Sequence, residues 1–328
     1  MNKPLSNLVP TLGLTVLATL FSNASLAAAI PVSSCGETLS VASGVYDLAN
    51  DLTTCPSTAI TITAKKIRFN LNGHTISGSN TGVGIDVQNI NGVSIVNGSV
   101  TGFVTGINVN NTINTRISSV NVSNNSTYGI YLNASSRNII SGNTISGNGA
   151  KGLYLLNSHY NNLMGNNSSG NGVGLIVGGV LAYDDGINLN TSNNNTITGN
   201  IISNNKEDGL ELKDSNNNFV YSNTANDNNR DGIYLRTKVA GATTTNNTVR
   251  YNNALHNGGS GIVVLAGATG NRLNSNISLN NNAIPSIDPA VTYADMSELN
   301  AKIADSCANT WITNTFDSTF DSSVDCIK

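Results

Sequence analysis

The sequence predicts an all-β chain wound into a single-stranded parallel β-helix, a solenoid of about eight to ten coils. Three observations favour this fold: a repeat with a period of 23 residues, a composition rich in Asn and Gly, and short alternations of apolar and polar residues. The 328 residues include 56 Asn and 32 Gly, which are both poor helix formers. A net charge of −3 and steadily recurring Ile and Val argue against disorder.

The first 29 residues are expected to be a secretory signal peptide. Lys3 supplies a positive charge, Leu8 to Phe21 form an apolar stretch, and Ala27-Ala28-Ala29 offers a small-residue cleavage site. No later segment of the sequence is long and apolar enough to span a bilayer. We therefore expect a secreted or periplasmic protein that has no membrane contact after cleavage.

Four cysteines lie as one pair near each end of the chain. The simplest pairing is Cys35 with Cys55 and Cys307 with Cys326, each closing a loop of about 20 residues. Neither pair has the spacing of a metal-binding motif or a nearby His, so both are expected to be structural disulfides. In the loop-entropy model each bond stabilises the fold by about 3 kcal/mol.

A motif of the form Gly-Ile/Leu-x-Val/Leu sets the repeat. Its glycines are Gly84, Gly106, Gly129, Gly152, Gly186, Gly209, Gly232 and Gly261. They lie 22, 23, 23, 34, 23, 23 and 29 residues apart, so the period is 23 with insertions of 11 and 6 residues. A coil with so few apolar residues is unstable alone, but stacked coils share one continuous core.

Two columns of Asn recur with the same period. They are Asn143, Asn166, Asn200, Asn223, Asn252 and Asn276, and, five residues on, Asn148, Asn171, Asn205, Asn228, Asn257 and Asn281. We expect both columns at tight turns, where Asn tolerates a left-handed backbone and bonds the Asn above and below.

The repeat divides the chain into four parts. After the signal peptide (1–29), residues 30–60 are expected to cap the first coil and residues 61–282 to form the β-helix. Residues 283–328 break the repeat and are expected to form a second cap, with a helix over 295–305. Such caps cover the open sheet edges at the two ends, and we expect a monomer.

Resemblance to a known superfamily adds to this picture. The coils with Asn-rich turns over about 60–282 resemble right-handed parallel β-helix repeats of pectate-lyase-like enzymes, mannuronan C5-epimerases and the periplasmic copper-maturation protein NosD. The resemblance implies right-handedness. It also implies that Asp185 or Asp208 matches the catalytic Asp of the epimerases, although their Tyr-Gly-x-Asp-Pro-His motif is represented only by Tyr183-Asp184-Asp185-Gly186.

Acidic residues precede the motif glycine in three consecutive coils. Asp185, Asp208 and Asp231 share this column, next to Lys151. Stacked coils are about 4.8 Å apart, so three carboxylates repel one another unless they are solvated, protonated or bridged by a cation. The column is therefore a candidate Ca²⁺ site, and no other cofactor is expected. The alternative is that Asp-Gly is only turn chemistry.

Other polar residues gather on the same coils. The outward x position of the motif carries Tyr131, Tyr154, Asn188, Glu211 and Tyr234. The position two residues later carries Lys213 and Arg236. The two insertions, around 172–180 and 238–243, flank this column and would form walls beside it. The alternative to a binding site is that the tyrosines merely stack on an exposed sheet and that the cations only confer solubility.

This chemistry suits an extended acidic polysaccharide. A uronate polymer loses its C5 proton when its carboxylate is neutralised and a base and a proton donor are present. The predicted catalytic residues are Asp208, Asp231, Lys213, Arg236 and Tyr234, and the predicted substrate-binding residues are Tyr131, Tyr154, Lys151, Asn188 and Glu211. The predicted protein therefore binds or modifies such a polysaccharide, and as an enzyme it would be a lyase or a C5-epimerase.

The composition argues against nucleic acid and copper as partners. With 16 Lys and Arg against 19 Asp and Glu, there is no basic excess for nucleic acid. The three His residues are not clustered, so no copper site is expected. The competing class is a non-catalytic structural, adhesion or periplasmic accessory β-helix.

Overall fold

The structure consists of strands and turns, with no helix among the described residues. It is a computed structural model that describes residues 28–173, 175–177, 180–182, 184–281, 294–300, 307–321 and 326–327. Nearly all of the expected signal peptide lies outside these ranges. No membrane-spanning helix is found within them. The all-β prediction is confirmed.

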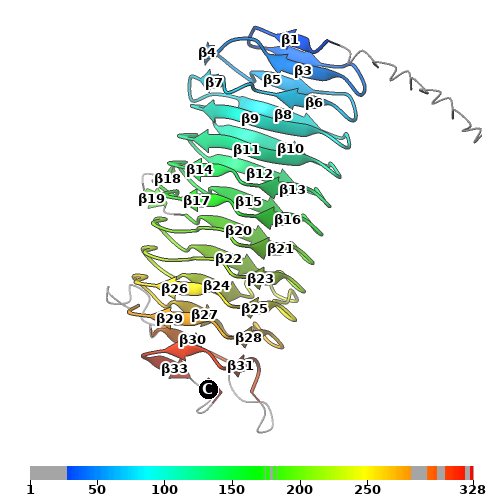
Figure 1. Cartoon of the computed structure of the whole chain (residues 1–328). Coiled ribbons are helices and arrows are strands. Elements are labelled where there is room, and N and C mark those ends of the chain that lie inside the picture. The colour runs from blue at the N-terminus through cyan, green and yellow to red at the C-terminus, as the bar shows by residue number, and fades with distance from the viewer. Residues whose placement is uncertain are drawn as a thin grey trace, which may run out of the picture.

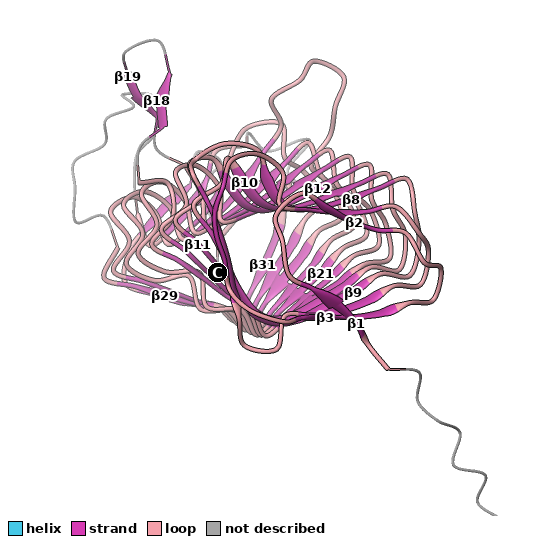
Figure 2. Cartoon of the chain, turned by 90° about the horizontal axis from the view of Figure 1, so that it is seen from above, coloured by secondary structure: helices cyan, strands magenta, loops and turns pink. Residues whose placement is uncertain are grey.

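The chain winds into a stack of coils whose strands form two long parallel sheets (Figure 1). Viewed along the stack, the two sheets lie on opposite sides of the coil outline (Figure 2). The 12-stranded sheet comprises β2 (Glu37–Leu39), β5 (Ile60–Ile62), β8 (Val83–Gln88), β10 (Thr105–Asn110), β12 (Tyr128–Asn133), β15 (Leu153–Leu156), β20 (Ile187–Asn190), β22 (Leu210–Lys213), β24 (Ile233–Arg236), β27 (Ile262–Val264), β30 (Met296–Glu298) and β33 (Thr319–Asp321).

The opposite sheet has 16 strands, and a third sheet of three strands follows it toward the C-terminus. The larger comprises β1 (Ile30–Val32), β3 (Val45–Leu48), β4 (Leu52–Cys55), β6 (Arg68–Asn70), β7 (Thr75–Gly78), β9 (Ser94–Thr101), β11 (Arg116–Ser123), β13 (Ile139–Ser141), β14 (Thr144–Ser146), β16 (Asn162–Met164), β17 (Asn167–Ser169), β21 (Thr196–Thr198), β23 (Phe219–Tyr221), β25 (Thr248–Arg250), β28 (Arg272–Asn274) and β31 (Thr310–Ile312). The third comprises β26 (Asn253–Leu255), β29 (Ile277–Leu279) and β32 (Thr315–Phe316).

The core runs along the inside of the stack. In the motif Gly-Ile-x-Leu the Ile and Leu alternate with x, so both point inward, as Ile187 and Leu189 do with no exposed surface. The motif glycine is needed because the chain passes very close to its neighbour. A Cβ at Gly232 would lie 2.5 Å from the carbonyl oxygen of Gly261. The motif is therefore a packing requirement.

Asn ladders hold the corners of the coils. In both predicted columns each buried Asn donates from Nδ2 to Oδ1 of the Asn in the next coil, for example Asn200 to Asn223 at 2.9 Å. A third ladder, which the sequence analysis missed, runs through Asn138, Asn161, Asn195, Asn218, Asn247, Asn271 and Asn309. Each Asn thus satisfies amide and carbonyl groups that the turns would leave buried without partners.

The left-handed backbone at these corners belongs to the residue before the ladder Asn, which corrects the expectation for the Asn itself. Gly199 with a φ of 63° precedes Asn200, and Ser222 with a φ of 52° precedes Asn223. The left-handed residue turns the chain so that the next side chain points inward. The amide then bonds along the stack axis, and the outward position before it is open to several residue types.

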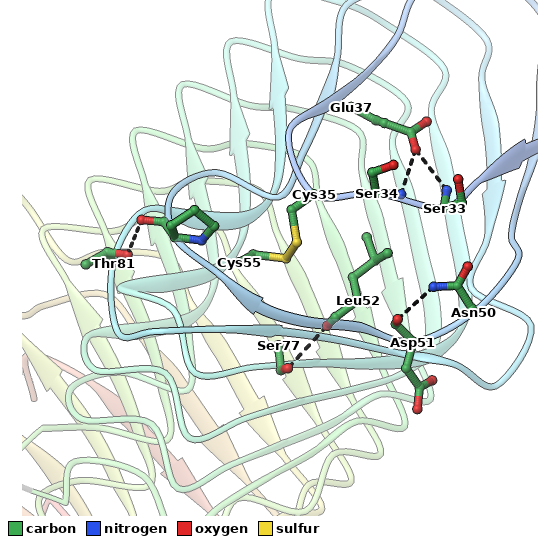
Figure 3. The surroundings of a disulfide bond; sticks show 11 residues. Ser33, Ser34, Cys35, Glu37, Asn50, Asp51, Leu52, Cys55, Ser77 and Thr81 are labelled. Atoms are coloured by element: carbon green, nitrogen blue, oxygen red, sulfur yellow. Dashed lines mark hydrogen bonds between the residues drawn. A yellow bond between two sulfur atoms is a disulfide. The ribbon is translucent and has the colours of Figure 1, made fainter.

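Both predicted disulfides are present. Cys35 is bonded to Cys55 and Cys307 to Cys326. Figure 3 shows the first bond joining the chain after β1 to the end of β4, beside the Glu37 carboxylate, which accepts the backbone N–H groups of Ser33 and Ser34. The first bond joins the first coil to the second, and the other bond lies at the C-terminal end of the stack.

The described part of the C-terminal region continues both sheets. Strand β30 pairs in parallel with β27, and β31 pairs with β28. The helix expected over 295–305 is therefore wrong for Met296–Glu298, because the exposed edge of β27 offers a ladder of backbone hydrogen bonds that outweighs local helix propensity. Residues 301–306 lie outside the described part.

We predict that removing one ladder Asn destabilises the whole stack. Asn223 accepts two hydrogen bonds from Asn200 and donates to the carbonyl of Ile197 and to Asn252. Asn223→Ala leaves these buried groups without partners and should lower the free energy of unfolding by about 3 kcal/mol or more. Urea denaturation measures it, with the exposed Asn229→Ala as the control; equal losses in the two variants would contradict the ladder's role.

Candidate functional site

The candidate site lies on the outer face of the 12-stranded sheet, where coils β15 to β24 stack. Parallel pairing places Asn188 opposite Glu211, and Glu211 opposite Tyr234. Two residues further along, Lys213 lies between Asn190 and Arg236 in the same manner. The register thus brings together the side chains that the sequence analysis assigned to one column.

The three Asp residues before the motif glycines stack as expected but are buried, with 2% or less of each exposed. Asp185 Oδ1 accepts the backbone N–H of Asp208, and Asp208 Oδ1 accepts that of Asp231. Asp231 Oδ1 accepts the N–H of Ser260 at 2.7 Å. The Asp column is therefore a ladder that runs from each coil to the next and resembles the Asn ladders.

One arginine that the sequence analysis did not single out pairs with this column. Arg230 lies 2.7 Å from Glu207, 3.7 Å from Asp208 and 3.4 Å from Asp231. Lys151, three coils earlier in the stack, pairs with Asp184. The signal for Arg230 was present in the sequence, because it occupies the same position of its coil as Asp184 and Glu207, one residue before the Asp column.

A second set of charges lies on the strands themselves. Glu211, with 3% exposed, pairs with Arg236 and accepts a hydrogen bond from Asn188. Tyr234 is also buried, with Arg230 4.7 Å and Arg236 5.2 Å from its ring centroid. Tyr234 therefore separates two guanidinium groups and stabilises both through its π-face.

Burial and mutual repulsion favour the neutral acids in this cluster. Burial, and then the neighbouring Glu211, raise the pKa of Asp185 well above its usual value. Burial raises the pKa of Asp208 well above its usual value, although Arg230 opposes this, and it raises that of Asp231 to about 6. Burial also raises the pKa of Glu207. The cluster therefore holds protons at mildly acidic pH or requires added positive charge.

Lys213 has a different environment. Its side chain is half-buried, and no carboxylate forms an ion pair with it among the described residues. Burial lowers its pKa, and the nearby cations Arg236, Lys238 and Lys151 act in the same direction, while Glu211 opposes them. A lysine whose pKa is lowered accepts a proton from a substrate more readily than an ordinary, fully protonated lysine does.

A tyrosine platform borders the cluster on its N-terminal side. The rings of Tyr131 and Tyr154 stack 5.2 Å apart at 14°, and Tyr128, which the sequence analysis omitted, lies 5.2 Å and 5.3 Å from them. The Tyr154 hydroxyl accepts a hydrogen bond from Asn190 at 3.2 Å, and Lys151 lies 5.2 Å from its ring centroid. Burial raises the pKa of Tyr131 to about 12. All three rings keep part of their surface open to solvent.

Three acidic side chains, of which Asp185 belongs to the predicted Ca²⁺ site, lie close enough together to hold a cation. Carboxylate oxygens of Asp184, Asp185 and Glu207 lie within 4.8 Å of one another. Two oxygens on opposite sides of a Ca²⁺ are about 5 Å apart, so the spacing and the all-oxygen donor set fit this ion. All three aspartates of the column use one oxygen in the ladder; the second oxygen of Asp208 and of Asp231 faces Arg230, and that of Asp185 accepts a hydrogen bond from Asn188.

The two insertions leave the coil on either side of the site. The first contains the antiparallel hairpin of β18 (Leu175–Val177) and β19 (Val180–Ala182), which projects beyond the coil outline (Figure 2). The second, after Arg236, is anchored by Asp214, whose Oδ1 accepts the N–H groups of Lys238 at 2.7 Å and Val239 at 3.3 Å. The second insertion is thus held against the coil that carries Lys213.

Comparisons with known proteins agree with this fold. Residues 180–316 match a family model described as a right handed beta helix region. Residues 38–181 match the model of the periplasmic copper-binding protein NosD. The chain is a right-handed parallel β-helix protein. No curated protein matches the sequence.

Solved structures with low sequence identity share the fold. The Dettilon tailspike protein is 19% identical with a TM-score of 0.59, and the alignment covers 76% of this chain but only 60% of the tailspike. The A-module of an Azotobacter vinelandii mannuronan C-5 epimerase is 14% identical, with a TM-score of 0.55 and coverages of 90% and 91%. The periplasmic alginate epimerase AlgG is 13% identical with a TM-score of 0.58, and the alignment covers 88% of this chain and 77% of AlgG.

We predict that the buried acids make the protein less stable as the pH rises. The pKa of Asp231 is about 6 in the fold against an ordinary 3.8, so between these values the folded chain holds a proton that the unfolded chain releases. Raising the pH from 4 to above 6 removes up to about 3 kcal/mol of stability. Urea titrations at pH 5 and 7.5 should show a smaller difference for Asp231→Asn than for the wild type; an unchanged difference would contradict the assignment.

Proposed function

We propose that the outer face of the 12-stranded sheet binds an acidic polysaccharide and that Lys213 removes the C5 proton of a uronate unit. The observation that carries this proposal is the environment of Lys213. It is a half-buried amine with a lowered pKa, lies beside a row of aromatic and cationic side chains, and has no carboxylate partner among the described residues.

The neighbouring residues supply the other roles. The tyrosine platform offers flat apolar faces on which sugar rings pack, and it leads along the stack toward Lys213. Asn190 pairs with Lys213 and bonds the Tyr154 hydroxyl, so an amine and a phenol lie on the two coils that flank Asn190. Arg236, on the other side of Lys213, provides a guanidinium that pairs with a uronate carboxylate.

The proposed chemistry starts with the transfer of the C5 proton to the neutral amine of Lys213. In the elimination route the C4–O bond then breaks, a C4=C5 double bond forms, and the leaving oxygen takes a proton from the Tyr154 hydroxyl. In the epimerisation route the C4–O bond stays intact, and the Tyr154 hydroxyl gives its proton to C5 from the opposite face. Arg236 stabilises the negative charge that develops on the carboxylate in both routes.

A bound Ca²⁺ would assist by neutralising the substrate carboxylate. Asp184, Asp185 and Glu207 would hold the ion. Two of these carboxylates would also keep their ion pairs, Asp184 with Lys151 and Glu207 with Arg230. The fold is shared with proteins named as alginate epimerases, which supports a uronate as the substrate class. A hard cation fits these carboxylates better than copper does.

A binding role without catalysis is the second candidate. It is favoured by the Asp ladder, because the three aspartates that the sequence analysis assigned to chemistry or metal binding are buried and used for backbone hydrogen bonds. Export to the periplasm or the exterior is part of the proposal for either role. The two disulfides support it because such bonds persist in oxidising compartments.

Replacement of Lys213 tests the catalytic role. Lys213→Met keeps the aliphatic stem but removes the base, so turnover on alginate or polygalacturonate should fall by about 10²-fold or more. Unsaturated ends are followed by ultraviolet absorption and epimer content by NMR. The control is Lys65→Met, which removes an exposed lysine between β5 and β6, far from Lys213 along the stack. Product from wild type and Lys213→Met at the same rate would reject the role, and binding without product in wild type would favour the second candidate.

Calcium titration tests the cation site. The wild type should bind Ca²⁺ in calorimetry, and the double variant Asp184→Asn/Glu207→Gln should bind it at least tenfold more weakly, because two of three carboxylate ligands lose their charge. Asp227→Asn removes an exposed carboxylate elsewhere and is the control. No uptake by the wild type, or an equal loss in the control, would rule the site out.

A further inference from the structure

A second surface with recognition chemistry lies on the other side of the coil, on the outer face of the 16-stranded sheet. We define the aromatic patch as Phe219 and Tyr221 of β23, Arg250 at the end of β25, and Tyr251, which follows β25 directly. We propose that the aromatic patch is a separate binding site for an acidic glycan. The choice of glycan class rests on the proposed function, whereas the existence of the patch does not.

The aromatic patch is an ordered cluster of exposed rings. The rings of Phe219 and Tyr221 are stacked 5.6 Å apart at 11°, and Tyr251 meets Tyr221 edge-on at 5.6 Å and 83°. Phe219 and Tyr251 are 36% and 47% exposed. Rings that pack on each other yet stay open to solvent offer a preformed flat surface to a sugar ring. Because these side chains are already ordered, they lose little entropy when the sugar binds.

Arg250 gives the aromatic patch a positive charge. Its guanidinium carbon lies 4.6 Å from the centroid of Tyr251 and 5.8 Å from that of Tyr221. Arg250 forms no ion pair among the described residues, and its Nε has no hydrogen-bond partner there. A guanidinium fixed over two rings and without a carboxylate is ready to pair with an anionic group on a ligand.

The surrounding sheet face shows which ligand class fits. Parallel pairing surrounds the patch with Thr198, Thr248 and Asn274, which are short polar side chains that hydrogen-bond hydroxyl groups. Arg272 on the next strand adds a second cation, and no acidic residue occurs in β21, β23, β25 or β28. Two arginines are few for a phosphate polymer, and the polar rim lacks the apolar extent of a protein interface.

The backbone at Tyr251 gives independent support. Tyr251 has a φ of 56°, in the left-handed region that bulky side chains rarely adopt. The corresponding position in other coils is filled by Gly142, Gly165, Gly199, Ser222 and Ser275. Packing does not require an aromatic ring here, since neighbouring coils close the same turn without one. Strain retained at an exposed position is typical of a functional site.

The location of the aromatic patch defines what it adds. Since the two sheets face opposite sides of the coil (Figure 2), one straight glycan segment cannot contact both Lys213 and Tyr251. The patch therefore holds a different segment or a different chain, and its effect grows with polymer length through the higher local concentration of substrate. Short oligosaccharides occupy one site at a time.

The test uses the residues of neighbouring coils as replacements. Phe219→Thr/Tyr251→Ser introduces the residues found in the same columns at Thr196 and Ser222, so the fold should be kept and the melting temperature should not fall. Binding to long alginate or polygalacturonate should weaken at least tenfold, while turnover of a short oligosaccharide is unchanged. Ile201→Thr, which removes an exposed apolar side chain outside the patch, is the control.

Two further measurements separate the patch from the catalytic face. Lys213→Met should keep the patch-dependent binding of long polymer, so loss of product and loss of binding occur in different variants. Arg250→Thr should weaken binding to the acidic polymer more than to a neutral galactan. The proposal is overturned if the double variant binds long polymer as the wild type does, if neutral galactan binds as tightly as polygalacturonate, or if a single-stranded oligonucleotide binds more tightly than either.

Discussion

The hydrogen bond from one buried Asn amide to the Asn in the next coil underlies the rest of this structure. Three ladders of such bonds fix the corners of successive coils, and each Asn also binds a backbone carbonyl of the previous coil, as Asn223 does with Ile197. The ladders fix the spacing and the register together. Because register is fixed, residues 23 positions apart become neighbours, and every surface column has a defined composition.

The Asp column shows what happens when the ladder carries charge. Asp185, Asp208 and Asp231 accept backbone N–H groups from the following coil, much as Asn would, yet a carboxylate has no amide group to donate along the stack. The negative charges therefore accumulate in a buried column. Arg230 offsets part of this repulsion, and the pKa of Asp231 is still raised. An uncharged Asn at these positions would avoid this repulsion.

The sequence was sufficient for the fold because the repeat constrains both composition and spacing. It was sufficient for the disulfides because four cysteines in two distant pairs leave one simple pairing. The sequence did not show whether the Asp side chains before the motif glycines point outward or are buried, because both orientations give the same 23-residue spacing. Arg230 was missed because its role depends on its neighbours in the stack and on no local motif. The helix expected near Met296 failed because pairing with β27 lies outside local propensity.

A solenoid surface separates structural from functional residues more clearly than a globular one does. Positions that point inward or hold a corner repeat in every coil, because each coil must meet the same neighbour. Outward positions meet no such requirement, so a departure there is free to serve a ligand. Lys213 and Tyr251 are both departures of this kind, one on each sheet. Tyr251 is the clearer case, because its left-handed backbone makes the aromatic residue unfavourable for folding while Ser and Gly serve at the same corner elsewhere. A residue that opposes the local preference of its own column is better evidence of binding than one that merely lies on an exposed face.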